Sequence, residues 1–307
     1  MPRFSIIVPS HGVTGRLSQA LDSVLGQSFG DLQLIPVCDA PDAPAAEVAA
    51  AGYAERDSRV TPVHSPPSAG LSGARNAGIK AATGTYLLFL DGDDLLLPGA
   101  LAALDARLSE TAGVDVLYAE HERAPWWEGE PTNPAAPLLA GAPKGAFAPA
   151  DRPALTGVQL PAWSAVYRRA FLTERELAFP EGHFTDLGWG GLVTVAAERI
   201  AVLRRTVVRH RLRRQGSRLN QPGPHQHTLL DQVERVLTRA AERALPAGRT
   251  GPLFDQLFAV VLKTASRPER LPSGHRAFFR RAARLYRRHR PAGHRVPGGS
   301  LGVQHRL

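Results

Sequence analysis

The stretch GLSGARNAGIKAATGTYLLFLDGDD, residues 70–94, combines three patterns that together decide the fold. Its first half predicts a helix of small residues that ends at Gly84, and the apolar run 85–90 predicts a buried strand. Three aspartates follow this strand at once, namely Asp91, Asp93 and Asp94. Like charges repel, so their clustering indicates a positive partner, and Mg²⁺ or Mn²⁺ suits carboxylate oxygens and substrate phosphates. Taken alone, the cluster also fits a turn, and Asp94 a cap of the next helix.

Strands and helices alternate on the N-terminal side of this stretch. Residues 4–10 and 32–39 predict buried strands and 59–64 a short third one, with helical patterns between them. Continuous apolar strands that alternate with helices indicate an α/β fold, a mostly parallel sheet with helices on both faces. Ligands bind beyond the carboxyl ends of such strands. Asp39 and Asp91 stand at two of those ends.

The second half of the chain is less regular. It predicts a helix from about 98 to 112, a strand at 114–120, a long irregular loop at 121–160, helices around 168–175 and 187–198, and a strand at 201–211. A linker-like stretch follows, and then three helical segments, of which the last is basic and amphipathic. The expected domains are residues 1–218 and a small basic helical extension at 219–307.

The net charge is +9, and arginine is concentrated late in the chain. From residue 270 to 307 there are ten arginines and no acidic residue. This pattern indicates an anionic partner (nucleic acid, acidic lipid headgroups or a polyanionic substrate), although a solvated basic face fits as well. No zinc-finger spacing, RNA-binding signature or helix-turn-helix pattern accompanies the arginines, so nucleic acid is the weakest of the three.

The sequence also bears on the cellular location. The single cysteine, Cys38, excludes an intramolecular disulfide and fits a reducing compartment. The N-terminal apolar run is too short for a signal peptide, and no run approaches the ~18 apolar residues that span a bilayer. The expected location is the cytoplasm. A peripheral contact with the inner face of the membrane through the basic C-terminus stays open.

Four features in order resemble the inverting nucleotide-sugar glycosyltransferases of family 2, which have the Rossmann-like GT-A fold. They are SIIVPS at 5–10, the strand that ends at Asp39, the block 74–94, and FPEGHFTD at 179–186. The resemblance covers about residues 4–217. It implies a nucleotide-sugar half at 1–95 and an acceptor half at 96–218. It also implies a Mn²⁺- or Mg²⁺-dependent enzyme that moves a sugar, typically from a UDP-sugar, to a glycan, lipid-linked or anionic polymer acceptor.

The same resemblance implies roles for eight residues on the donor side. Asp39 would accept a hydrogen bond from the base, typically uracil. Asp91 would contact the ribose or the water shell of the metal, and Asp93 would bind the metal that bridges the two phosphates. By itself, Asp39 also fits a turn. The remaining residues would line the nucleotide pocket and the diphosphate cleft, although the last two also fit an ordinary helix surface: Pro9, Ser10, Gly70, Arg75 and Asn76.

On the acceptor side, the resemblance gives Asp186 the role of catalytic base. A base is needed because the acceptor hydroxyl loses its proton as it attacks the anomeric carbon. Asp186 also fits a helix N-cap. His210 stands where some relatives have a metal ligand, and a structural histidine fits there too. Residues expected near the acceptor or the diphosphate, among them two tryptophans that also fit core positions, are Trp163, Trp189, Arg211, Arg213 and Ser217.

Three positions depart from the family pattern. His11-Gly12 replaces the usual Tyr-Asn, Cys38 replaces the first of two usual aspartates, and Thr185 replaces the usual Glu. We interpret the chain as an active enzyme with an altered donor or acceptor preference. The alternatives are a catalytically inactive module that binds glycans or polyanions, and a nucleotidyltransferase, for which SHGVTGR at 10–16 is a poor phosphate-binding loop.

A narrower resemblance concerns the C-terminal segment LPSGHRAFFRRAARLYRRHRP, residues 271–291. It is similar to the segment that follows family 2 domains fused to CDP-glycerol glycerophosphotransferases in actinobacterial wall teichoic acid synthesis. This resemblance implies that the arginines hold a polyol-phosphate acceptor or the membrane surface.

Overall fold

The computed structural model describes residues 1–10, 14–38, 44–65, 70–125, 129–155, 160–212, 221–271 and 274–293. The chain divides into two compact units. The first comprises residues 1–148, 162–181 and 197–214, and the second comprises residues 149–161, 182–196 and 215–307. The second unit thus takes in two segments from earlier in the chain. The expected domain boundary at residue 218 stays a prediction.

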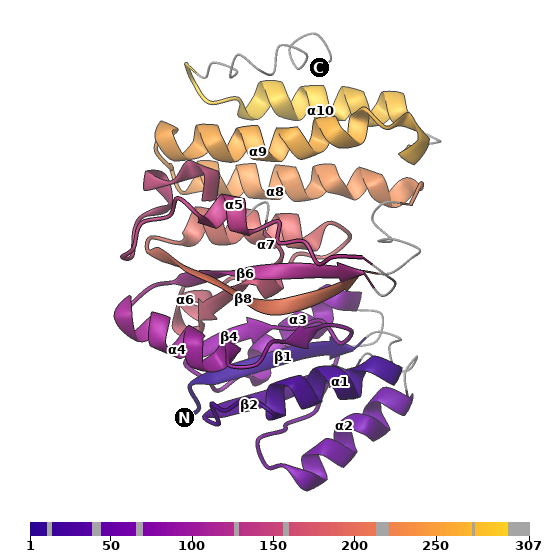
Figure 1. Cartoon of the computed structure of the whole chain (residues 1–307). Helices are drawn as coiled ribbons and strands as arrows, with labels where there is room; N and C mark the ends of the chain where they lie inside the picture. The colour runs from indigo at the N-terminus through magenta and orange to yellow at the C-terminus, as the bar shows by residue number, and fades with distance from the viewer. Residues whose placement is uncertain are drawn as a thin grey trace. The chain divides into compact units, whose positions relative to one another are not determined.

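The first unit is built on a mixed sheet (Figure 1). Its strands, within the described residues, are β1 (Phe4–Ser10), β2 (Leu32–Cys38), β3 (Val63–His64), β4 (Tyr86–Phe89), β5 (Leu95–Leu96), β6 (Val116–Pro125), β7 (Ala165–Arg168) and β8 (Ile200–Leu212). They lie in the order β3-β2-β1-β4-β7-β6-β8-β5. The pairs β1–β2, β2–β3, β1–β4 and β6–β8 are parallel, whereas β7 runs antiparallel to β4 and β6, and β5 to β8. The predicted α/β class is confirmed.

The helices of the first unit connect and cover these strands. They are α1 (Thr14–Leu25), α2 (Pro44–Arg56), α3 (Gly70–Ala81), α4 (Ala100–Glu110), α5 (Ala136–Leu139), α6 (Arg169–Glu174) and the 3₁₀ turn η4 (Ala162–Ser164). The small residues of α3 have a packing reason. A Cβ atom at Gly78 would lie 2.3 Å from Cγ2 of Ile7 on β1. Only glycine lets α3 approach the sheet this closely, which explains a glycine in the middle of a helix.

Two predictions about the irregular segments need correction. The region 121–160 is not one loop: β6 continues to Pro125, and Arg123 and Thr132 exchange two backbone hydrogen bonds of 2.7 and 3.0 Å. The helix α5 and an antiparallel bridge between Phe147 and Ile200 attach more of this region to the sheet. Proline, glycine and alanine are frequent here, so the local pattern hid these pairings. The third predicted strand is shorter than expected, at Val63–His64.

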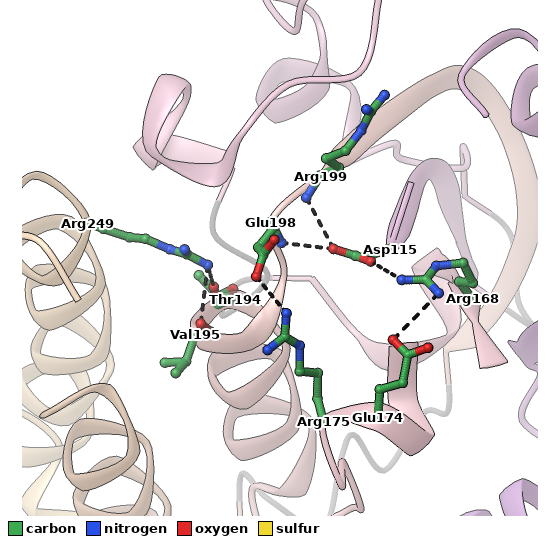
Figure 2. A network of polar contacts seen from close by, with 9 residues as sticks. All are labelled: Asp115, Arg168, Glu174, Arg175, Thr194, Val195, Glu198, Arg199 and Arg249. Carbon is green, nitrogen blue, oxygen red and sulfur yellow. Dashed lines mark hydrogen bonds and ion pairs between the residues drawn. The ribbon is translucent and has the colours of Figure 1, made fainter. Parts of the chain in front are cut away.

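A polar network links the ends of β6, β7 and β8 (Figure 2). Asp115, just before β6, accepts a 2.7 Å hydrogen bond from Nη2 of Arg168 at the end of β7. Its other oxygen accepts from the backbone N–H groups of Glu198 and Arg199, at 2.9 and 3.2 Å, just before β8. Glu198 in turn pairs with Arg175 at 2.6 Å. One carboxylate therefore joins three neighbouring strands of the first unit.

The second unit is helical. It contains α7 (Thr185–Ala196), α8 (Thr228–Glu242), α9 (Ala247–Ala265), α10 (His275–His289) and the 3₁₀ turns η1 (Pro149–Asp151), η2 (Pro153–Leu155), η6 (Pro224–His227) and η7 (Pro268–Arg270). Helices α8, α9 and α10 lie side by side (Figure 1) and share an apolar cluster that includes Val233, Leu257 and Phe278, all fully buried. Arg249 donates to the carbonyls of Thr194 and Val195 on α7 (Figure 2). In the part of the chain that the structure describes, no helix is long and apolar enough to cross a membrane.

Candidate active site

The aspartate cluster forms a turn against the carboxyl end of β1. The N–H of Gly92 donates to the carbonyl of Pro9 at 3.2 Å, and a Cβ atom at Gly92 would lie 3.0 Å from the same oxygen. The N–H of Asp94 donates to the carbonyl of Asp91 at 2.9 Å, which closes the turn. Ser10 is buried, and its hydroxyl donates to the carbonyl of Val37 at 3.2 Å. The turn therefore lies beside Pro9 and Ser10, whose role in a nucleotide pocket stays a prediction.

Arg75 forms an ion pair with Asp91. Its side chain is fully buried, and Nη2 donates to Oδ1 of Asp91 at 3.0 Å. The guanidinium also lies 4.9 Å from the ring centroid of Phe179, a cation–π contact. Asp91 itself is 24% exposed. Arg75 therefore orients a carboxylate at the site and is neither an exposed helix residue nor an open wall of a diphosphate cleft.

Asn76 and Ser72 secure a different segment. The Asn76 amide donates to the carbonyl of Phe179 at 3.0 Å and accepts from its N–H at 2.8 Å. The Ser72 hydroxyl donates to the carbonyl of Pro180 at 2.8 Å. Both side-chain groups of the Asn76 amide are thus used to hold this segment against α3. Gly70 begins α3 with a φ of 58°, and a Cβ atom there would meet nothing within 4 Å.

Asp94 joins the turn to β8. Its fully buried carboxylate accepts from Nδ1 of His210, at 2.9 and 3.1 Å to its two oxygens, and from the N–H of Arg211 at 3.0 Å. Nε of Arg211 donates to the carbonyl of Asp93. Burial raises the pKa of Asp94 to about 6, against the opposing effect of His210. Burial disfavours the charged form of His210, but its bond to Asp94 and the nearby aspartates outweigh this and raise its pKa.

Trp163 is a core residue of the first unit. It is 4% exposed, its ring stacks on His210 with centroids 5.0 Å apart, and it meets His121 edge-on at 4.6 Å. Trp189, on α7 of the second unit, is fully buried. Both observations favour the core alternative over stacking on an acceptor sugar, because a buried ring offers no open face to a ligand.

His121 is a buried histidine for which the described residues provide no hydrogen-bond partner. It is 1% exposed, and neither ring nitrogen has an acceptor or donor within reach in that part of the chain. Burial, with the positive charges of Arg123 and His210, lowers its pKa to about 4. The imidazole is therefore neutral in the folded protein at pH 7.

Replacing His121 by phenylalanine is expected to flatten the pH dependence of stability. In the unfolded protein this side chain has a pKa of 6.5, whereas in the folded protein its pKa is about 4. As the pH falls from about 6.5 to about 4, the unfolded protein therefore binds a proton that the folded protein does not, and the free energy of unfolding decreases. Between pH 7 and pH 5 the loss from this group is about 2 kcal/mol of unfolding free energy. Urea unfolding at both pH values should show a drop that is smaller by this amount in His121→Phe. Equal drops in the two proteins would contradict the assignment.

Asp186 lies in the first turn of α7 and belongs to the second unit. Its side chain is half-buried, and Thr185, the first residue of the helix, is buried. Its role as catalytic base stays a prediction. Asp39, Arg213 and Ser217 lie outside the described residues. Arg211 is described, and it binds the aspartate turn and Gln19 within the first unit.

Comparison with known proteins decides the family. The family model described as Glycosyl transferase family 2 matches residues 5–210. The chain belongs to this family. EpsJ of Bacillus subtilis, described as an uncharacterized glycosyltransferase, is 42% identical over 112 residues, which are 36% of this chain and 31% of EpsJ. The minor teichoic acid biosynthesis protein GgaB of B. subtilis is 37% identical over 99 residues, 31% of this chain and 11% of GgaB.

The solved structures agree on the fold of this family 2 chain. Residues 1–349 of S. aureus TarS in complex with UDP-GlcNAc match with a TM-score of 0.72 and 19% sequence identity, over 93% of this chain and 83% of that one. A likeness at this identity confirms the GT-A fold. The chain matches less than a third of the length of EpsJ and less still of GgaB.

The donor set of this family 2 site suits a hard divalent cation. Asp91 and Asp93 offer carboxylate oxygens at the turn, and Mg²⁺ or Mn²⁺ is commonly held by one or two carboxylates together with substrate phosphates. Nδ1 of His210 is bonded to Asp94, which leaves only its Nε2 to reach a metal. Among the described residues, no three acidic, histidine or cysteine side chains converge as a preformed metal site. Asp91 and Asp93 could therefore supply carboxylate ligands to such a cation.

The sequence did not reveal that Asp94 and His210 form a pair. The two residues lie 116 positions apart, and the local pattern suggested a helix cap for Asp94. That interpretation is wrong, since α4 begins at Ala100 with Gly99 at its N-cap. The available signal was that the resemblance gives the aspartate cluster and a histidine at position 210 roles at the same metal, which together could have suggested a contact.

Proposed function

We propose that this chain is a metal-dependent, inverting glycosyltransferase that moves a sugar from a UDP-sugar to a hydroxyl of a teichoic-acid-like polyol-phosphate polymer. The observation that carries the proposal is the aspartate turn of a family 2 chain, held against the end of β1 with Asp91 oriented by Arg75. This is the edge of an α/β sheet where ligands bind. The cytoplasmic location expected from the sequence stays a prediction.

In the proposed reaction, the acceptor hydroxyl oxygen attacks the anomeric carbon of the sugar. The bond from that carbon to the β-phosphate oxygen breaks, and its electron pair leaves with the nucleoside diphosphate. Attack opposite the leaving group inverts the anomeric configuration, and Asp186 takes the hydroxyl proton. Asp91 and Asp93 would hold the metal, which would neutralise charge on the diphosphate. Arg75 and the Asp94–His210 pair keep the turn in place.

The relatives support the donor and acceptor classes. TarS was solved with UDP-GlcNAc, which favours a uridine nucleotide for a chain of the same fold. GgaB is described as a minor teichoic acid biosynthesis protein, and its likeness to this chain favours a polyol-phosphate acceptor. The high content of arginine near the C-terminus suits such an acceptor, because each repeat carries a phosphodiester charge.

Thermal unfolding with UDP, GDP, CDP and dTDP, each with and without Mn²⁺, tests the donor site. A ligand of the folded state stabilises it by about 2.7 kcal/mol at a hundredfold excess over its dissociation constant. We expect UDP with Mn²⁺ to give the largest shift and UDP alone a smaller one. No shift with any nucleotide would oppose the enzyme and support the inactive binding module. Transfer of labelled sugar from a UDP-sugar to poly(glycerol phosphate) then tests the reaction.

A further inference from the structure

Helix α10 carries several arginines that form no ion pair among the described residues. Six arginines lie within the helix. Two of them are matched by acidic residues of α8: Arg281 pairs with Asp231 at 2.6 Å and with Glu234 at 3.0 Å, and Arg288 pairs with Glu234 at 3.4 Å. The other four are exposed and have no ion pair among the described residues, and they form what we call the arginine face: Arg276, Arg280, Arg284 and Arg287.

The arginine face is a single straight row. At 100° per residue these four positions fall within an arc of ~80° on the helix. The buried positions Phe278, Ala282 and Leu285 lie on the opposite side, in the apolar cluster of the second unit. The row spans ~16 Å, with steps of ~6 Å or less along the helix axis. The four arginines and the residues of the apolar cluster therefore lie on opposite sides of α10, although the small buried residue Ala283 lies beside the row.

Such a row is electrostatically unfavourable on its own. Like charges at i and i+4 destabilise a helix, and the steps are shorter than the Debye length of ~8 Å at physiological ionic strength, so screening between neighbours is incomplete. The acidic residues of α8 that face α10 are already paired with Arg281 and Arg288. A bound polyanion would remove this repulsion and release the anions that otherwise accompany the row.

The surroundings of the row favour a soluble linear polymer over a membrane or a nucleic acid. A helix that binds a bilayer inserts its apolar face, but that of α10 is buried in the unit's core. In the described residues the exposed large apolar side chains are Met1, Val48 and Leu71, none of which lies on α10. The row also offers no aromatic platform for bases, since Phe279 and Tyr286 pack against the apolar cluster.

We infer that the arginine face of α10 is a binding track for the phosphodiester groups of a polyol-phosphate chain. Successive arginines along the helix would contact successive phosphates along the polymer. This inference rests on the proposed function, because it supplies a second contact for the same acceptor. It assigns that contact to residues of the second unit outside the aspartate turn. Binding through the track then needs neither the nucleotide nor the metal.

The test uses the full chain and fluorescent poly(glycerol phosphate), without nucleotide. The variant R276Q/R280Q/R284Q/R287Q should bind about 10- to 1,000-fold more weakly than wild type at 0.1 M salt, and the slope of log K against log salt should fall in magnitude by about 2 to 3. Glutamine suits an exposed helix position, so the fold should persist. A matched variant, R56Q/R199Q/R204Q/R205Q, removes four exposed arginines from the first unit and should bind like wild type.

The outcomes separate this inference from the proposed function. A loss of affinity below about threefold in the first variant, or an equal loss in both, would overturn the arginine face. Binding to phosphatidylglycerol vesicles or to an oligo(dT) strand that depends on the row, with no such dependence for the polymer, would overturn it too. Absence of sugar transfer by the wild type, with polymer binding lost only in the first variant, would instead remove the proposed function and leave the track supported.

Discussion

Replacing Asp186 by asparagine is expected to lower the rate of sugar transfer by about 10²- to 10⁴-fold, the usual contribution of a positioned general base. Asparagine keeps the size and the hydrogen-bonding shape of the side chain but cannot take a proton from the acceptor hydroxyl. The position lies in the first turn of α7, where the substitution removes one charge without creating a cavity. Initial rates with a labelled UDP-sugar, at saturating acceptor, measure the effect.

Two comparisons make this prediction specific. Nucleotide binding by Asp186→Asn should equal that of wild type, because the proposed role of Asp186 is to take a proton from the acceptor and not to hold the donor. A matched variant, Asp151→Asn, neutralises an exposed aspartate of the same unit and should retain transfer. If Asp186→Asn keeps more than about a tenth of the wild-type rate, the base is a different residue.

The parts of the fold that follow from local patterns were predictable. The strands β1 and β4 are continuous apolar runs because parallel strands with helices on both faces are buried throughout. The aspartates come directly after the apolar run at residues 85–90, so the sequence placed them at the end of a strand. The strand β7 could not be predicted in the same way. It has four residues, and its pairing with β4 joins residues about eighty positions apart, which no local pattern encodes.

The side chains of the site show the same limit. The residue types of Arg75 and Trp163 do not reveal that both are buried, since burial depends on what the fold brings beside them. Arg75 is tolerated in the interior because Asp91 and the ring of Phe179 compensate its charge. Trp163 fills the space between His210 and His121. Sequence reasoning therefore placed the aspartate cluster at the end of a strand and missed the partners that hold its residues in place.

The second large effect is expected at Asp93. Replacing it by asparagine should abolish the gain in nucleotide affinity that Mn²⁺ provides and should lower transfer by about 100-fold or more, because charge on the leaving diphosphate is no longer neutralised. Asp93 is 8% exposed, so an isosteric change is chosen to avoid a cavity. Titration of UDP with and without Mn²⁺, followed by calorimetry, measures the gain directly.

Asp93 should matter more for the metal than Asp91 does. Asp91 is already ion-paired with the buried Arg75, and that positive charge weakens its attraction for a second cation. Asp91→Asn should also destabilise the first unit, since it removes the carboxylate charge that Nη2 of the buried Arg75 contacts. Asp105→Asn, which removes a carboxylate of the same unit paired with Arg3 on the surface of α4, serves as the charge control and should keep the full metal effect. If Asp93→Asn retains that effect as well, the metal is held elsewhere or takes no part in nucleotide binding.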